Sequence, residues 1–269
     1  MQIYKCMNIG TAKPSIEERN GIPHHLFDIA EPEEEFSCAS YKKLAEKAIS
    51  DIVSRGKTPI FCGGTGLYLD SVLRGGELSP NIPSGIRESL EKKPPEELWD
   101  ELIKVDSSSA SLTHQNNIKR VVRALEIYYG TGKTKTEWDD LSKTVESPYD
   151  AVIFGLDFKD REKLYSRINL RVDMMLEVGL ENEVRTLAHR LGKTASQAIG
   201  YKELISYING KISYDEAVEL LKKNTRNYAK RQLTWFRRNE NTVWSYPDQE
   251  SREQIFENIV NIAKKHLNR

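Results

Sequence analysis

Two arginines spaced four residues apart, Arg167 and Arg171, are well suited to chemistry on a phosphorylated ligand. In a helix this spacing places both guanidinium groups on one face, where they can bind a diphosphate through paired hydrogen bonds. Three acids close in sequence, Asp157, Asp160 and Asp173, allow a different interpretation, a surface ladder of salt bridges. The spacing alone leaves both interpretations open.

A second candidate is the cationic stretch, residues 222–238, which carries seven Lys and Arg side chains and no acid. The chain as a whole has 40 cationic and 40 acidic residues, so this charge is local. Helical spacing would put Tyr228 and Trp235 on one face and Arg226 and Lys230 on another. Such a helix fits a nucleic-acid backbone, and the alternative is an ordinary solvated basic face.

A glycine-rich turn, residues 63–66, follows a short apolar run at residues 58–62. We expect that run to be a buried strand and residues 67–73 to be a helix, which together would form a βα unit of a parallel sheet. The glycines would let a ligand approach backbone N–H groups, and Thr65 would add a hydroxyl. The same residues are equally compatible with a simple turn.

Three other features carry no predicted site. Residues 130–134 resemble the end of a phosphate-binding loop, but Ile127 stands where its first glycine is required and no strand precedes it. His24 and His25 are adjacent, so in an extended segment they point to opposite faces and cannot share a metal ion. Three widely spaced cysteines form neither a metal pair nor a disulfide framework, and we expect them to be buried thiols: Cys6, Cys38 and Cys62.

The elements around these residues indicate a soluble protein of one large or two modest domains, since the chain has 269 residues of which 38% are apolar. Gly, Ser and Pro at residues 75–80 predict a hinge. No run is long enough for a membrane-spanning helix and the start lacks a signal-peptide pattern, so we expect a cytoplasmic protein. The expected elements are a helix at 41–54 capped by Ser37, helices without strands at 84–129, a strand at 151–156, a long helix at 161–190 and further helices from residue 197.

Eight blocks of residues follow one another along nearly the whole chain: residues 1–4, 8–14, 23–26 with 28, 63–68, 123–126, 167–173 with 179–180, 197–203 and 228–237. Together they resemble the tRNA dimethylallyltransferase family. The resemblance implies transfer of a dimethylallyl group from dimethylallyl diphosphate to N6 of adenosine 37, next to the tRNA anticodon, with Mg²⁺ as cofactor. The implied partners are the anticodon stem-loop and the diphosphate donor, with no membrane, and the implied state is a monomer.

The resemblance also implies an α/β fold. Residues 1–78 and 148–269 would form a parallel-sheet core like that of P-loop NTPases together with C-terminal helices, and residues 79–147 an inserted all-helical domain. Family members carry a first strand, a phosphate-binding loop and a general-base Asp before the block that starts at Met1. This chain contains none of the three, so we expect an N-terminally truncated form that binds tRNA weakly and catalyses little transfer.

By the same resemblance, Thr65 and Arg171 are catalytic, Arg167 and Arg171 bind the diphosphate, and no residue is a metal ligand. The implied tRNA-binding residues are Met1, Gln2, Thr65, Arg87, Lys119, Arg120, Val121, Val122, Arg123, Gln197, Ala198, Ile199, Gly200, Tyr201, Lys202, Lys230, Arg231, Gln232, Leu233, Thr234, Trp235, Phe236 and Arg237.

Two other functions share parts of this pattern. An adenylate isopentenyltransferase would use a free nucleotide, which has no need of the second basic patch at residues 119–123, and its binding would weaken less steeply with salt. A non-catalytic RNA-binding remnant would bind tRNA and produce no prenylated adenosine. An ordinary phosphotransferase is disfavoured because its phosphate loop and catalytic Asp motif are missing.

Overall fold

The computed structural model describes residues 1–73, 79–80, 82, 85–143 and 145–268. Residues 75–78 of the predicted hinge lie outside this set. The chain forms two units, the first comprising Met1–Phe36, Ala48–Gly66 and Ala151–Arg269, and the second Ser37–Lys47 and Leu67–Asp150. None of the described helices is both long and apolar enough to cross a membrane.

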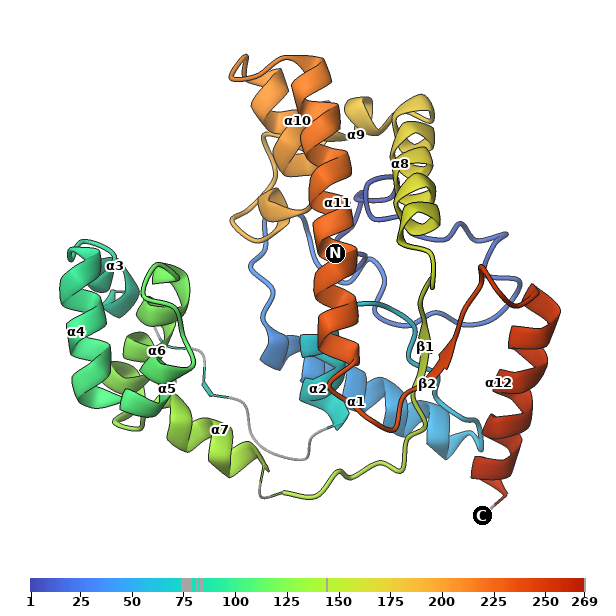
Figure 1. Cartoon of the computed structure of the whole chain (residues 1–269), viewed down its shortest axis with the longest axis horizontal. Coiled ribbons are helices and arrows are strands. Elements are labelled where there is room, and N and C mark those ends of the chain that lie inside the picture. Colours follow the sequence, from blue (N-terminus) through green and yellow to red (C-terminus); the bar gives the residue numbers. More distant parts are fainter. Residues whose placement is uncertain (74–78, 81, 83–84, 144, 269) are drawn as a thin grey trace. The chain divides into compact units, whose positions relative to one another are not determined.

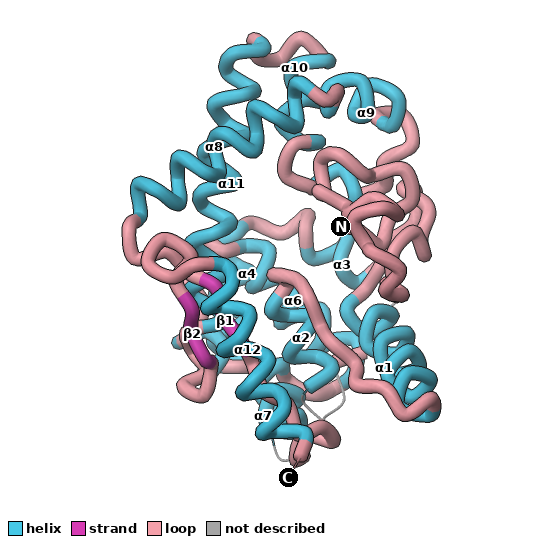
Figure 2. The backbone as a smooth tube through the Cα atoms, turned by 90° about the vertical axis from the view of Figure 1, so that its right-hand side faces the viewer, coloured by secondary structure: helices cyan, strands magenta, loops and turns pink. Residues whose placement is uncertain are grey.

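The first unit is mostly helical and contains a short parallel sheet (Figure 1). Phe154 pairs with Val243 and Leu156 with Ser245, and Figure 2 shows the two strands side by side in magenta. The α/β class is therefore confirmed, with helices greatly outnumbering strands. The elements are β1 (Phe154–Leu156), α8 (Arg161–Glu177), α9 (Leu180–Leu187), the 3₁₀ helix η1 (Ala195–Gln197), α10 (Tyr201–Ile208), α11 (Tyr214–Phe236), β2 (Val243–Ser245) and α12 (Arg252–Leu267).

The core of the first unit joins the N-terminal segment to helices α8–α11. Tyr4 and Met7 are fully buried and pack in the same cluster as Leu180, Tyr201 and Leu221. These buried side chains hold the loop-rich N-terminal segment against the helices. Burial of each large side chain stabilises the fold by about 1.5–3 kcal/mol.

The second unit is helical throughout its described part. Its core lies between α4 and α6, where Leu98 and Leu102, four residues apart, face Val121 and Leu125. Gly132 ends α6 in the left-handed conformation at φ 74°, as is usual for a glycine at a helix C-terminus. The helices are α1 (Cys38–Ser54), whose last residues belong to the first unit, α2 (Gly66–Leu73), α3 (Ile86–Leu90), α4 (Pro95–Val105), α5 (Ser107–Ser111), α6 (Ile118–Thr131) and α7 (Lys135–Lys143).

Three sequence predictions are wrong. Residues 58–62 form no strand, and Ile60 is 87% exposed, because no described segment pairs with this run. The predicted helix at 161–190 is two helices, because Gly179 adopts φ 101° and separates α8 from α9. The cysteines are not all buried thiols, since Cys6 and Cys62 are exposed and Cys38 is half-buried.

Candidate functional site

Helix α11 positions the cationic stretch. It begins with a capping box, in which the Glu216 N–H donates to Ser213 Oγ at 3.2 Å and the Ser213 N–H donates to the Glu216 carboxylate at 2.8 Å. Leu221 and Leu233 are buried and hold the helix against its own unit. Asp215 and Glu216 lie in the first turn of α11, where the helix dipole favours negative charge.

Acids distant in sequence offset part of this positive charge. Lys222 Nζ lies 2.7 Å from Asp173 Oδ1 of α8, and Arg237 pairs with Asp157, whose side chain is only 3% exposed. Arg226 donates to Asn169 Oδ1 at 2.6 Å. Residues 222–238 contain no acid, but the fold places Asp157 and Asp173 beside them. The positive electrostatic potential of the stretch is therefore weaker than the sequence indicates.

The remaining cations of α11 lie toward solvent. Lys223 and Lys230 are exposed and seven residues apart, which places them on one face. Arg238 stacks over the Trp235 ring at 3.8 Å from its centroid, and Arg231 lies 5.6 Å from the Tyr228 centroid. Lys223 and Lys230 therefore form an exposed cationic row, while Arg231 and Arg238 lie against the aromatic rings of a neighbouring face.

The glycine-rich turn packs directly on α11 within the first unit. A methyl group at Gly64 would lie 1.5 Å from Gln232 Nε2, and one at Gly66 would lie 2.1 Å from Trp235 Cδ1. The Trp235 Nε1 atom is buried and has no hydrogen-bond partner in the part of the chain that the structure describes. The exposed Thr65 is thereby brought to the C-terminal half of the cationic helix.

Arg167 and Arg171 are both exposed on α8, which packs against α11. The predicted alternative, a salt-bridge ladder with nearby acids, is formed in part, because Arg161 Nη1 lies 3.8 Å from Asp157 Oδ1. Arg167 and Arg171 form no ion pair among the described residues. Asp160 instead caps α8, accepting from the Glu162 N–H at 2.9 Å, and Asp173 pairs with Lys222. Both guanidinium groups are therefore accessible to an anion from solvent.

Several predicted tRNA-binding residues have side chains that form the core instead. They lie in α6 and α11, at the start of α10 and just after η1, and their side chains are buried. These residues are Val121, Val122, Ala198, Tyr201 and Leu233, with Gly200 also buried. Gln2 is partly engaged as well, because its Nε2 donates to the carbonyl oxygens of Thr11 and Ala12 at 3.1 and 3.0 Å.

Of the remaining predicted tRNA-binding residues, Lys202, Lys230, Arg231 and Thr234 are exposed. Lys119, Arg120 and Arg123 lie on α6 of the second unit, where Lys119 and Arg120 are exposed. Arg87 on α3 belongs to the same unit, whereas the cations of α8 and α11 belong to the first unit.

Glu183 of α9 is a structural residue that the sequence did not reveal. Its carboxylate accepts hydrogen bonds from the N–H groups of Asn8, Ile9 and Gly10 at 2.9, 2.8 and 3.0 Å, and also from the Tyr201 hydroxyl. Burial, together with this bond to Glu183, raises the pKa of Tyr201. Two blocks of the resemblance, residues 8–14 and 197–203, are thus joined by one carboxylate.

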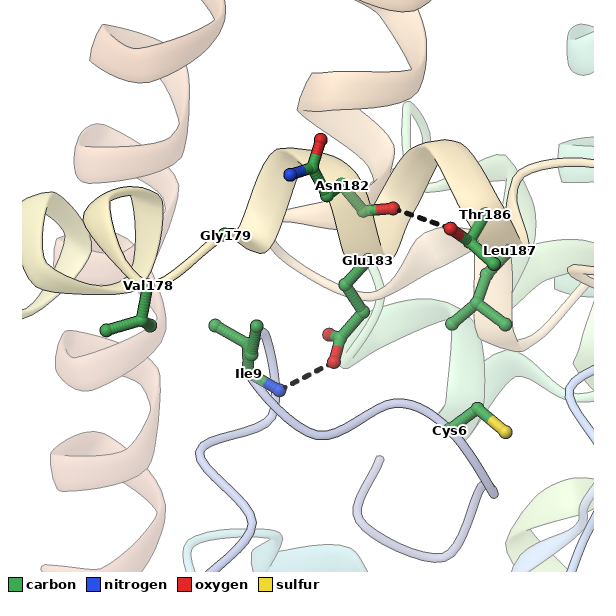
Figure 3. A pocket seen from close by; sticks show the side chains of 8 residues that line it. All are labelled: Cys6, Ile9, Val178, Gly179, Asn182, Glu183, Thr186 and Leu187. Carbon is green, nitrogen blue, oxygen red and sulfur yellow. Dashed lines mark hydrogen bonds between the residues drawn. The ribbon is translucent and has the colours of Figure 1, made fainter.

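A cavity of about 390 Å³ lies beside this junction (Figure 3). Glu183 forms part of its wall, but the hydrogen bonds to the loop already occupy the carboxylate. The cavity is lined by Cys6, Ile9, Val178, Gly179, Asn182, Glu183, Thr186 and Leu187. None of the predicted site residues lines it, so we assign it no part in binding the donor or RNA.

A short parallel sheet in a mostly helical fold, with a cationic helix against a glycine-rich turn, defines an α/β protein with exposed cations on α8 and α11. A family model described as IPP transferase matches residues 2–239. The chain therefore belongs to the IPP transferase family.

Individual relatives agree with this assignment. The chain is 49% identical to a tRNA dimethylallyltransferase from Anoxybacillus flavithermus over 97% of its own length and 83% of that protein. A crystal structure of a tRNA isopentenylpyrophosphate transferase from Staphylococcus epidermidis matches with a TM-score of 0.70 and 41% identity, covering 98% of this chain and 88% of that one. A eukaryotic dimethylallyltransferase acting on tRNA matches with a TM-score of 0.82 and 28% identity, covering 100% of this chain and 71% of that one.

Proposed function

We propose that this protein transfers a dimethylallyl group from dimethylallyl diphosphate to N6 of adenosine 37 in tRNAs. The observation that carries the proposal is the 49% identity, over 97% of the chain, to a tRNA dimethylallyltransferase. The cationic face of α11 and the exposed arginine pair of α8 support it, because one surface suits an RNA backbone and the other a diphosphate.

The reaction makes two demands on the protein. The N6 lone pair of adenine is delocalised into the ring, so the base must leave its stack and be aligned with C1 of the donor. As the N6–C1 bond forms, the C1–O bond breaks and the diphosphate leaves with its electron pair. We assign stabilisation of that charge to Arg167 and Arg171, and contact with the RNA near the reacting base to Thr65. The N6 proton passes to a base that we do not assign within the described residues.

Mg²⁺ would complement the charge of the donor diphosphate. No group of three His, Cys, Asp or Glu side chains among the described residues is placed to hold a metal ion. Mg²⁺ would be held through oxygens of the donor diphosphate, because oxygen ligands suit this ion. We assign no step of the transfer to a protein-bound metal.

We further propose that the core and the inserted domain have the separate binding roles that the resemblance implies. The P-loop-NTPase-like core, residues 1–78 and 148–269, would bind the donor and the modified base. The inserted helical domain, residues 79–147, would contact the anticodon stem-loop through Arg87 and residues 119–123. We propose that the protein acts on tRNA in the cytoplasm as a monomer.

Acceptor choice tests the proposal. The chain is incubated with radiolabelled dimethylallyl diphosphate and Mg²⁺, and with either an anticodon stem-loop or AMP as the acceptor. We expect label in the stem-loop, and stem-loop binding that weakens steeply as salt rises. Label in AMP alone would instead identify a nucleotide-specific enzyme, and salt-dependent RNA binding without any label would identify a non-catalytic RNA-binding protein.

A further inference from the structure

A buried acid lies between two of the arginines of the second unit. Glu126 on α6 has a side chain that is only 6% exposed, and its Oε2 lies 2.8 Å from Arg123 Nη1 and 3.5 Å from Arg87 Nη1. Arg123 comes from the same helix, three residues earlier, whereas Arg87 comes from α3. A single carboxylate oxygen therefore joins cations from two helices.

The two guanidinium groups are held but not buried. Their side chains are 32% and 33% exposed, for Arg87 and Arg123 respectively. Arg123 Nη2 also lies 3.4 Å from Ser79 Oγ and 3.3 Å from the Pro80 carbonyl oxygen. Arginine side chains that are already fixed lose less conformational freedom when they bind a phosphate, so this arrangement is preorganised for an anion.

A second acid, Glu91, forms an ion pair with Arg87 on the solvent side. Its Oε1 lies 3.0 Å from Arg87 Nε, and its side chain is 50% exposed. Such an exposed pair contributes little stability, whereas removing one partner of a buried pair is costly. An incoming phosphate would therefore displace Glu91 and leave Glu126 in place.

We propose that Glu126 is a positioning residue that holds Arg87 and Arg123 as a pair for two neighbouring phosphates of the tRNA backbone. This inference rests on the proposed function in tRNA modification. With Glu91 displaced, the two arginines and Glu126 leave a net charge of +1 facing the RNA. Glu126 would favour RNA binding by orienting the two arginines, although its own negative charge repels phosphate.

This role predicts opposite signs for two substitutions that remove the same charge from the same arginine. If only net charge mattered, Glu126→Gln and Glu91→Gln would both strengthen RNA binding. If Glu126 positions the arginines, E126Q weakens binding, because the guanidinium groups lose their fixed partner. E91Q strengthens it or leaves it unchanged, because a competing acid is removed.

The test measures the dissociation constant for an anticodon stem-loop over a range of salt concentrations, with the full chain and its variants. We expect E126Q to weaken binding about tenfold, the equivalent of one charge-assisted hydrogen bond. The slope of log K against log salt should also fall by about 0.7 for each phosphate that the variant no longer binds. The KM for dimethylallyl diphosphate should not change, and the effect of E126Q should be smaller in an Arg87→Ala background.

Thermal unfolding checks that each variant is folded. If E126Q does not fold, Glu126→Asp replaces it, because the shorter side chain keeps the charge but cannot reach both arginines; weakened binding is again expected. Parent-like or tighter binding by E126Q, or by E126D where it replaces E126Q, would overturn the positioning role alone, as would an equal loss in E91Q. A parent chain that does not bind the stem-loop would overturn the proposed function, and this inference with it.

Discussion

Glu183 is the residue on which the N-terminal loop most depends. Three successive backbone N–H groups, from Asn8 to Gly10, donate to its carboxylate, and Tyr201 donates a fourth hydrogen bond. A methyl group at Gly10 would lie 2.5 Å from Tyr201 Cε2, so the loop also needs a glycine to approach α10. Residues 8–10 of the block at 8–14 therefore have a structural role in the loop.

Glu183→Ala should lower the free energy of unfolding by about 2–4 kcal/mol, because partly buried N–H groups lose a charged acceptor. Urea denaturation measures the change. Glu181→Ala is the matched control on the same helix. Glu181 pairs with Arg185 at 2.7 Å near the surface, and loss of this pair should cost less than about 0.5 kcal/mol. Equal losses in the two variants would contradict the role given to Glu183.

Tyr129 supplies a pH-dependent contact between α6 and α4. Its hydroxyl donates to Glu101, and this bond raises the pKa of Tyr129 to about 12 from an ordinary 10.0. Because the pKa is higher in the folded state, the contribution to stability is complete below pH 10 and disappears as pH rises toward 12.

Tyr129→Phe should therefore unfold more easily than the parent near neutral pH, and the difference should shrink between about pH 10 and 12. Urea denaturation of both proteins across that range measures it. A difference that stays constant with pH would show that the hydroxyl does not titrate as the contact with Glu101 requires.

At the scale of elements, the glycine-rich turn and α11 form one packed junction. A side chain at Gly66 would meet the rigid indole of Trp235, whereas one at Gly64 would meet only the mobile end of Gln232. Gly66→Ala should thus destabilise the protein by about 1–3 kcal/mol, as overpacking does.

Gly64→Ala is the control and should cost less, because the Gln232 side chain can rotate away. Thermal unfolding and tryptophan fluorescence report the two effects, and only G66A should change the environment of Trp235. If G64A proves as costly as G66A, then backbone conformation, and not contact with Trp235, determines the need for glycine in this turn.

Local patterns predicted those elements that depend on local physics. Ser37 caps α1 as expected, accepting from the Ser40 N–H at 3.0 Å, and β1 lies inside the strand expected at 151–156. Residues 58–62 have the composition of a strand, but a strand also needs a partner, which composition does not reveal. The partner of β1, Val243–Ser245, was missed because a three-residue strand carries almost no periodic signal.

At the scale of the whole molecule, the sequence located the cations but not the acids that offset them. Arg237 and Asp157 are 80 residues apart, and Lys222 and Asp173 are brought together only by the packing of α8 on α11. The sequence also did not reveal that Val121, Tyr201 and Leu233 are buried, because each lies in a motif that also contains exposed cations. Resemblance found the family, whereas the structure separates the exposed residues of these motifs from the buried ones.

The expectation that this chain catalyses little transfer stays a prediction. The relatives that it matches are somewhat longer, since it covers 83% of the Anoxybacillus flavithermus protein and 88% of the Staphylococcus epidermidis structure. The rate of transfer by the chain itself decides how much activity residues 1–269 support.

The most direct measurement of the central claim is to locate the modified nucleoside after full-length tRNA is incubated with this protein, dimethylallyl diphosphate and Mg²⁺. Nuclease digestion and mass spectrometry should place one dimethylallyl group on adenosine 37, and a tRNA with guanosine at that position should stay unmodified. Arg171→Ala should slow the transfer about 100-fold or more, because the leaving diphosphate loses a cation. Unmodified tRNA at high protein concentration, or a dimethylallyl group at another position, would contradict the account.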